Sequence, residues 1–258
     1  LWFLIVMSAL ESEIYDILLL AGLVGAAATF VTLFFVSAPY GRHARAGWGP
    51  SINARWGWVI MEAPAALAMP AWILVSTNFN VGIAALVALW ELHYIHRAFI
   101  YPFRAPKSDK RNPLSVVGMA FLFNLWNSYL NGRHLGVYAV TYEDLLTLPR
   151  FWAGLSLFIA GLAINWIADT RLLQLRRTDD SYQVPRGGLF EYVSCPNYLG
   201  ECIEWMGWAI MTSSPAGLCF ALWTIANLVP RARTHHRWYR QQFPDYPARR
   251  RALVPFIY

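Results

Sequence analysis

Two groups of polar residues lie in apolar surroundings and could bind or transform a ligand. The first is the stretch 185–204, PRGGLFEYVSCPNYLGECIE, which opens on a Pro-Arg-Gly-Gly turn whose glycines can adopt angles closed to other residues. We expect Ser194 to cap the next helix, with Pro196 in its first turn and Glu201 and Glu204 on one face. Carboxylates at the mouth of an apolar helix need partners, which predicts a polar-ligand site at a membrane surface. Solvated acids on a capped helix are the alternative.

The second group lies within apolar segments. Glu62 is followed closely by Pro64, where a helix loses a backbone hydrogen bond and bends. Three- and four-residue steps then give one polar helix face: Glu91, Tyr94, Arg97 and Tyr101. Because such groups are rare in lipid without a partner or a cavity, we predict a functional role for Glu62 and for Tyr94 with Arg97. The off-stripe His93 and His96 fit packing or interfacial roles better. Interhelical hydrogen bonds are an equal alternative for Asn124, Asn127 and Asn165.

The composition is that of a membrane protein. Of 258 residues, 57% are hydrophobic and 14% are charged, against about 25% charged in soluble domains. The chain is also rich in Trp, Tyr and Phe, as expected where aromatic side chains line the membrane interface. The opening LWFLIVMSAL has no basic region before it and no clear cleavage site, so we do not assign it as a signal peptide. The three cysteines have no metal-binding spacing, and no metal is expected.

Seven apolar segments predict an all-α, polytopic membrane protein with a single domain over residues 1–258. The expected spans are 14–38, 57–77, 81–101, 114–130, 151–168, 197–212 and 216–229. In the first span, Gly22 and Gly25 form a small-residue face that favours helix packing over nucleotide binding.

The positive charges predict the orientation. All but three of the 21 lysines and arginines lie in the loops after the first, third and fifth spans or in the tail. By the positive-inside rule, the N-terminus then faces out and the C-terminus is cytoplasmic. The stretch 185–204 and the basic tail share that side and could hold an anionic ligand between them. Orientation and lipid contact alone would explain the same bias.

Soluble nucleotide-binding and hydrolase motifs are absent. The sequence contains no G-x-G-x-x-G after a strand, no P-loop, no H-E-x-x-H and no G-x-S-x-G. Any nucleotide would therefore be held by membrane helices rather than by a Rossmann domain.

Several motifs together resemble the steroid 5α-reductase family over nearly the whole chain. They are GGLFEYVSCPNYLGECIEW, ARTHHRWY, DYPARRRALVPFIY, ELHYIHRAFIY and the Glu-Ala-Pro segment at Glu62. The likeness is strongest from about residue 165 onward. The chain departs from familiar members at Met61, where they carry Gln, which bears on steroid preference more than on the reaction. Gln183 stands where some members carry Arg.

The resemblance implies NADPH-dependent reduction of the C4–C5 double bond of 3-oxo-Δ4 steroids or similar enones. Glu62 and Tyr94 match the pair that polarises the substrate carbonyl, and Asn197 and Glu201 match positions at the nicotinamide. Further matched positions lie near the ribose, phosphates and adenine: Arg97, Asp169, Arg176, Tyr182, Arg231, His235 and Tyr239. The expected partners are a lipophilic, steroid-like substrate and membrane lipid, with no nucleic acid and no implied oligomer.

Three alternatives stay open. GLFEYVSCPNYLGE is also similar to membrane methyltransferases that modify isoprenylcysteine or phospholipids with S-adenosylmethionine. A related reductase could act on an enoyl-CoA or a polyprenol, and a small-molecule transporter is a third possibility that the lack of repeats disfavours. The expected location is a bacterial inner membrane or the endoplasmic reticulum, with the cofactor site on the cytoplasmic face.

Overall fold

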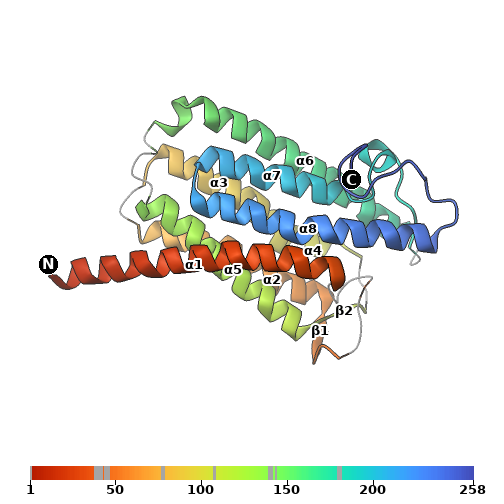
Figure 1. Cartoon of the computed structure of the whole chain (residues 1–258), viewed down its shortest axis with the longest axis horizontal. Helices are drawn as coiled ribbons and strands as arrows, with labels where there is room; N and C mark the ends of the chain where they lie inside the picture. The colour runs from red at the N-terminus through yellow and green to blue at the C-terminus, as the bar shows by residue number, and fades with distance from the viewer. Residues whose placement is uncertain are drawn as a thin grey trace.

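Long helices running side by side make up most of the molecule (Figure 1). The computed structural model describes residues 2–37, 43, 47–76, 79–106, 109–138, 142, 144–178 and 182–258. Within these, each predicted span overlaps one long helix, and in the third span that helix ends before the span does. The helices are α1 (Trp2–Phe35), α2 (Ala54–Leu74), α3 (Val81–Ile95), α5 (Leu114–Arg133), α6 (Pro149–Thr178), α7 (Pro196–Thr212) and α8 (Pro215–Gln242). The all-α prediction is confirmed, although the predicted span ends at Ala38 and Thr77 lie outside the described residues.

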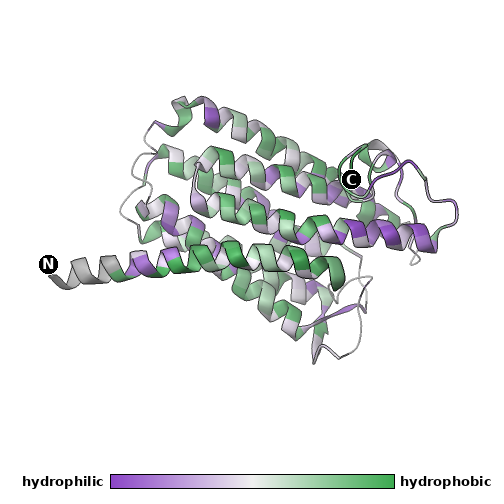
Figure 2. Cartoon of the chain, in the orientation of Figure 1, coloured by the Kyte–Doolittle hydropathy of each residue, from purple (hydrophilic) through white to green (hydrophobic). Residues whose placement is uncertain are grey.

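Four helical segments of the described chain are long and apolar enough to cross a membrane. They are Leu10–Phe35, Ala54–Leu74, Val81–Arg104 and Pro149–Arg176. Hydrophobic residues cover most of the long helices, whereas hydrophilic residues gather at the C-terminal end of α8 (Figure 2). The protein is therefore a helical membrane protein. The remaining three spans and the orientation of the termini stay predictions.

Short elements fix the ends of the helices. The strands β1 (Ser51–Asn53) and β2 (Arg111–Pro113) pair antiparallel beside the start of α2. Asn53 then caps α2 by accepting a hydrogen bond from the backbone N–H of Arg55 at 3.0 Å. The third predicted span is not one uniform helix, because α3 passes through a π-helical turn, η2 (His96–Ile100), into α4 (Tyr101–Arg104). A second π turn, η3 (His134–Tyr138), follows α5, and two 3₁₀ turns complete the described elements: η4 (Leu145–Thr147) and η5 (Gly188–Glu191).

The turn before α7 matches the prediction in its glycines but not in its cap. Gly187 and Gly188 have φ angles of +84° and +56°, a region that side chains with a Cβ rarely adopt. Pro196 begins the helix as expected, but the N-cap is Cys195 and makes no capping side-chain bond. The Ser194 prediction was therefore wrong. The reason is that its hydroxyl is bonded to His236 at 2.7 Å and to Tyr246 at 2.6 Å, both from the C-terminal region.

Glycines set the distance between α6 and α7, which share the most extensive helix interface. A Cβ added at Gly200 would lie 2.6 Å from the backbone nitrogen of Asn165, and one at Gly154 would lie 2.6 Å from the carbonyl oxygen of Gly207. Gly161 faces the backbone of Glu204 just as closely. The two backbones therefore touch, which brings polar side chains of both helices within reach of each other.

The main core lies beside this interface and is aromatic. Trp90 of α3 packs against Trp205 and Trp208 of α7 and Phe220 of α8, with ring centroids 5.3–5.7 Å apart. At the other side of the bundle, Gly22 and Gly25 of α1 lie against the rings of Trp126 and Trp223, which confirms their predicted role in helix packing.

Candidate active site

Arg97 stands at the centre of a buried cluster of carboxylates from three other helices. Its guanidinium lies 3.8 Å from Glu62 of α2, 3.3 Å from Asp169 of α6 and 3.6 Å from Glu201 of α7. All four side chains are at most 18% exposed. The π turn carries Arg97, and such turns commonly occur where a helix must redirect a side chain at a functional site.

Aromatic rings hold Arg97 in place. Its guanidinium lies 4.7 Å from the ring centroid of Trp58 and 5.5 Å from that of Tyr101, both favourable positions for a cation. Trp58 also donates its indole N–H to the backbone oxygen of Arg97 at 3.0 Å. Both the backbone and the guanidinium of Arg97 are therefore held in place, and the three carboxylates converge on this fixed guanidinium.

Asparagine amides orient the carboxylates. Asn124 of α5 donates to Glu62 at 3.3 Å and to the backbone oxygen of Met61 at 2.6 Å. Asn197 donates to Asp169 at 3.0 Å. Asn165 in turn donates to the backbone oxygen of Asn197 at 3.0 Å and reaches Glu201 at 3.5 Å. Asn124 and Asn165 thus act as interhelical hydrogen-bond groups within the site.

Tyr94 lies beside this cluster, one helical turn from Arg97. It is 3% exposed, and its ring packs 4.8 Å from Trp90 and 5.7 Å from Trp205. Glu62 is close enough to Tyr94 for the two side chains to interact electrostatically. The hydroxyl makes no hydrogen bond to another residue of the described chain, so it can still donate to a ligand.

His93 and Glu204 form a separate buried pair behind Tyr94. The Nδ1 atom of His93 lies 2.8 Å from a carboxyl oxygen of Glu204, and both side chains are at most 5% exposed. Glu201 and Glu204 therefore both face the third helix, as their spacing predicts, but they engage different partners there.

A second group of predicted residues lies along α8 and the start of α7. Arg231 donates to the hydroxyl of Tyr198 at 3.0 Å, and that hydroxyl lies 3.1 Å from His235. The other ring nitrogen of His235 is 3.1 Å from His43, whose ring stacks on it. Tyr198, which directly follows Asn197 in the chain, therefore links the start of α7 to Arg231 and His235 of α8.

The three remaining predicted residues are Arg176, Tyr182 and Tyr239. Arg176, near the end of α6, is exposed and lies close to Tyr101 and Asp169, at the edge of the Arg97 cluster. Tyr182 packs edge-on against Trp238 with ring centroids 5.1 Å apart, and Lys110 lies over its ring. Tyr239 is 3% exposed and stacks in parallel on Tyr246 at 5.4 Å, which makes it part of the packing beneath the tail.

The C-terminal region folds back onto the turn that precedes α7. Arg251 exchanges backbone hydrogen bonds of 2.8 Å with Tyr192 and Ser194, and the buried Arg250 donates to the carbonyl of Pro185 at 3.1 Å. His236 contacts Ser194 in this region. Burial lowers the pKa of His236 from its ordinary value of 6.5, and the positive charges of neighbouring arginines lower it further.

Sequence reasoning did not find three supporting residues of the site. Trp58 and Tyr198 contribute through contacts with other helices, and His236 through Ser194 in the segment before α7, so no local pattern in the sequence marks them. Tyr198 was the most accessible to prediction, because it directly follows Asn197 at the start of α7.

The two groups together have the donors and acceptors that a dinucleotide needs. Amide and carboxylate groups of Asn197 and Glu201 can pair with a carboxamide, and the arginines Arg176 and Arg231 suit phosphates through their planar fork of donors. Arg97, Asp169 and Glu201 now satisfy one another, so a cofactor held by them would have to replace some of those contacts. On donor chemistry, the residues fit such a group.

Comparisons with known proteins agree with this class of site. Residues 110–258 match the model of the family described as 3-oxo-5-alpha-steroid 4-dehydrogenase. The steroid 5-alpha-reductase DET2 of Gossypium hirsutum is 42% identical over 258 residues, covering 97% of this chain and 100% of the relative. The 3-oxo-5-alpha-steroid 4-dehydrogenase 1 of Macaca fascicularis is 42% identical, covering 85% and 84%, and that of Homo sapiens is 40% identical, covering 85% and 86%.

The fold and these relatives define a membrane-embedded oxidoreductase that acts on a carbon–carbon bond. The chain belongs to the 3-oxo-5-alpha-steroid 4-dehydrogenase family, that of the steroid 5-alpha-reductases. The family resemblance found in the sequence is confirmed, and the comparisons favour a reductase over a methyltransferase or a transporter.

Proposed function

We propose that this protein reduces the C4–C5 double bond of a 3-oxo-Δ4 steroid or a similar enone, using NADPH. The cofactor, when bound, would supply a hydride to C5 of the substrate, and a proton from water would complete the reduction at C4. As the hydride arrives, negative charge develops on the C3 oxygen. The task of the protein is to stabilise that charge, hold both reactants and exclude water.

Glu62 and Tyr94 stabilise the developing charge in this proposal. A carboxyl group donates a hydrogen bond only when it is protonated, so this role requires the neutral form of Glu62. Asn124 holds Glu62 from the side of α5, and the aromatic packing around Tyr94 restricts its ring. The substrate oxygen would accept one hydrogen bond from each group.

The unpartnered hydroxyl of Tyr94 beside Glu62 is the observation that carries this proposal. The Tyr94 hydroxyl is not among the described side-chain atoms that are both fully buried and unpaired, so a ligand can reach it. Here the hydroxyl has no partner within the described chain, while aromatic rings enclose the rest of the side chain. A carbonyl oxygen of a lipophilic substrate would supply the missing acceptor.

The remaining residues of the site bind the cofactor in this scheme. Asn197 and Glu201 hold the nicotinamide end next to Arg97 and Asp169. Arg176 and Arg231 contact phosphates, and we expect the extra phosphate of NADPH to make it the preferred cofactor. Tyr182, His235 and Tyr239 stay predictions for the ribose and adenine end, with Tyr239 acting through packing.

The proposed topology has seven spans, with the N-terminus outside and the C-terminus in the cytoplasm. The start of α1 and the C-terminal segment lie at opposite ends of the bundle, which agrees with this arrangement (Figure 1). Arg231 and His235 lie in the hydrophilic end of α8, where a cytoplasmic cofactor could enter (Figure 2).

A turnover assay with purified protein tests the proposal. Detergent-solubilised protein is given NADPH and a panel of enones that includes a 3-oxo-Δ4 steroid, an enoyl-CoA and a polyprenol-type substrate. NADPH consumption is followed by absorbance, and products are identified by mass spectrometry. We expect a 5α-reduced steroid; turnover of only the enoyl-CoA or the polyprenol would assign a different substrate class. Binding of S-adenosylmethionine without any NADPH consumption would contradict the reductase itself.

A further inference from the structure

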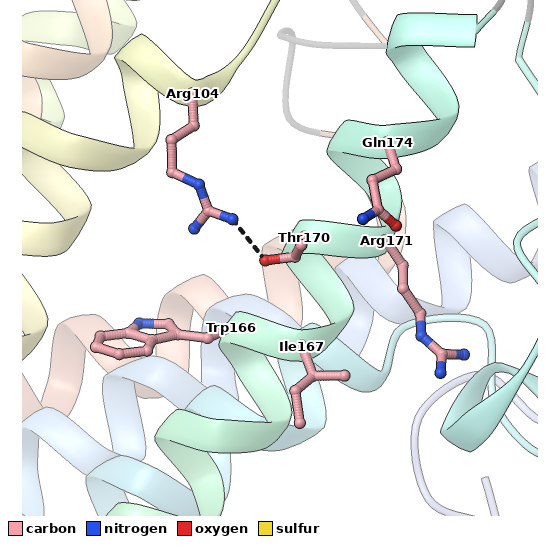
Figure 3. A pocket seen from close by; sticks show the side chains of 6 residues that line it. All are labelled: Arg104, Trp166, Ile167, Thr170, Arg171 and Gln174. Carbon is pink, nitrogen blue, oxygen red and sulfur yellow. Dashed lines mark hydrogen bonds between the residues drawn. The ribbon is translucent and has the colours of Figure 1, made fainter.

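A hollow of about 350 Å³ lies between α4 and α6 (Figure 3). It is lined by Arg104, Trp166, Ile167, Thr170, Arg171 and Gln174. Helical spacing of about 100° per residue turns these α6 positions away from Asn165 and Asp169. Ile167 is 58% exposed, so the hollow opens to the surroundings of the bundle rather than to its interior.

The hollow lies at the end of two candidate membrane spans. Arg104 is the last residue of the span Val81–Arg104, and Arg171 and Gln174 fall in the last two turns of the span Pro149–Arg176. At this level the hydrocarbon of a bilayer gives way to phosphate head groups. The exposed Ile167 then faces acyl chains while the arginines stand at the phosphate level.

Both positive charges are held in place by other groups. Arg104 donates to the hydroxyl of Thr170 at 2.8 Å and lies 3.2 Å from a ring nitrogen of His96. His96 in turn packs on Trp166 with ring centroids 4.4 Å apart. On the far side, Arg171 donates to the backbone oxygen of Arg186 at 3.2 Å.

None of the six lining residues is acidic. Asp169, whose charge also interacts with that of Arg104, lies within bonding distance of Arg97 and Asn197 on the other face of α6. The lining therefore combines two cations and two uncharged hydrogen-bonding side chains with an apolar floor.

We propose that this hollow binds the phosphate of an anionic phospholipid. Arg104 and Arg171 supply the charge, and Thr170 and Gln174 supply hydrogen bonds to the head group. Trp166 and Ile167 contact the glycerol and the first carbons of the acyl chains. A soluble phosphate offers the same anion, but it would leave that apolar floor uncovered.

Lipid retention by the purified full-length protein tests this. Native mass spectrometry from detergent measures bound phosphatidylglycerol for the unmodified protein and for the R104Q/R171Q variant. The R240Q/R249Q variant is the matched control, because it removes the same charge from exposed positions outside the hollow. Each arginine near a membrane surface strengthens anionic lipid binding several-fold, so we expect affinity to fall at least about tenfold in R104Q/R171Q and to stay unchanged in the control.

Further arms identify the occupant. The R104K/R171K variant keeps both positive charges and should retain most of the lipid binding. Circular dichroism of every variant checks that it is folded, because misfolding would also abolish lipid binding. Phosphatidylcholine, which is zwitterionic, should bind at least several-fold more weakly than phosphatidylglycerol. Equal retention by R104Q/R171Q and the control would overturn the proposal, as would equal binding of the two lipids. Displacement of phosphatidylglycerol by an equal concentration of inorganic phosphate would assign the hollow to a soluble anion instead.

Discussion

Replacing Tyr94 with Phe removes one hydroxyl and leaves the ring packing intact. The rings of His93, Trp90 and Trp205 lie 4.8–5.7 Å from that of Tyr94, and Phe has the same shape against them. The lost hydroxyl makes no hydrogen bond within the described chain, so folding should lose little. Any large effect must therefore arise when the substrate is bound.

The expected effect of Tyr94→Phe is a slower hydride transfer. Removing one donor from a site that stabilises a developing oxyanion costs about 3 kcal/mol, or roughly a hundredfold in rate. The assay is single-turnover hydride transfer with NADPH at saturation, together with a binding titration of NADPH. The rate should fall while the Kd for NADPH stays unchanged, because the hydroxyl acts on the substrate and not on the cofactor.

Tyr142→Phe is the matched control. Tyr142 belongs to the same buried core, but its hydroxyl donates to the backbone oxygen of Thr212 at 2.5 Å. Its loss should lower thermal stability by about 1–3 kcal/mol and leave the hydride-transfer rate unchanged. If Tyr94→Phe transfers hydride at the unmodified rate, Tyr94 is not the electrophile and the proposed mechanism fails.

Four other predictions concern Glu62, the start of α7, Arg231 and His236. Glu62→Gln keeps the size and one donor, so its single-turnover rate should exceed that of Glu62→Ala; the reverse order would make the carboxyl a packing group. Asn197→Ala and Glu201→Ala should each lower turnover at least about tenfold with the helical circular dichroism unchanged, since small misplacements of the reactants are costly; normal turnover in both would mean that these residues only support the helix end. Arg231→Ala should raise the Kd for NADPH more than that for NADH, and equal use of the two cofactors by the unmodified protein would contradict a phosphate contact. The pKa of His236 is lowered below 6.5 in the folded protein, so folding favours the neutral ring and the free energy of unfolding should fall as the pH drops through 6.5. Thermal unfolding of His236→Gln should lose that part of the pH dependence. Identical pH profiles of the variant and the unmodified protein would refute this prediction.

The sequence predicted the helices well because their signals are local. Apolar runs of membrane length, the two glycines of the turn at 187–188 and the proline at the start of α7 each constrain only a few neighbouring residues. Ser194 shows the limit of such reasoning. The Ser194 hydroxyl could bond either to the start of α7 or to residues far away in the sequence. It bonds to His236 and Tyr246, and no local sequence pattern indicates these contacts.

The partners within the site could not be predicted in the same way. Glu62, Asp169 and Glu201 were each identifiable as polar residues in or near apolar segments, but their convergence on Arg97 depends on how four helices pack. The π turn also shifts the face of the third helix after Tyr94, which a regular 3.6-residue period does not anticipate.

Because α6 and α7 are in close contact, glycines outside the charged cluster influence its geometry. A single methyl group at Gly161 or Gly200 would force the two backbones apart, because each Cβ would meet backbone atoms of the other helix. Asp169 belongs to α6 and Glu201 to α7. The guanidinium of Arg97 has a fixed width, so it contacts both carboxylates only while the two helices stay this close. Under the proposed function, a packing defect at these glycines would therefore be measured as weaker cofactor binding. The separation of α6 and α7 that these glycines permit therefore also sets the distance between Asp169 and Glu201.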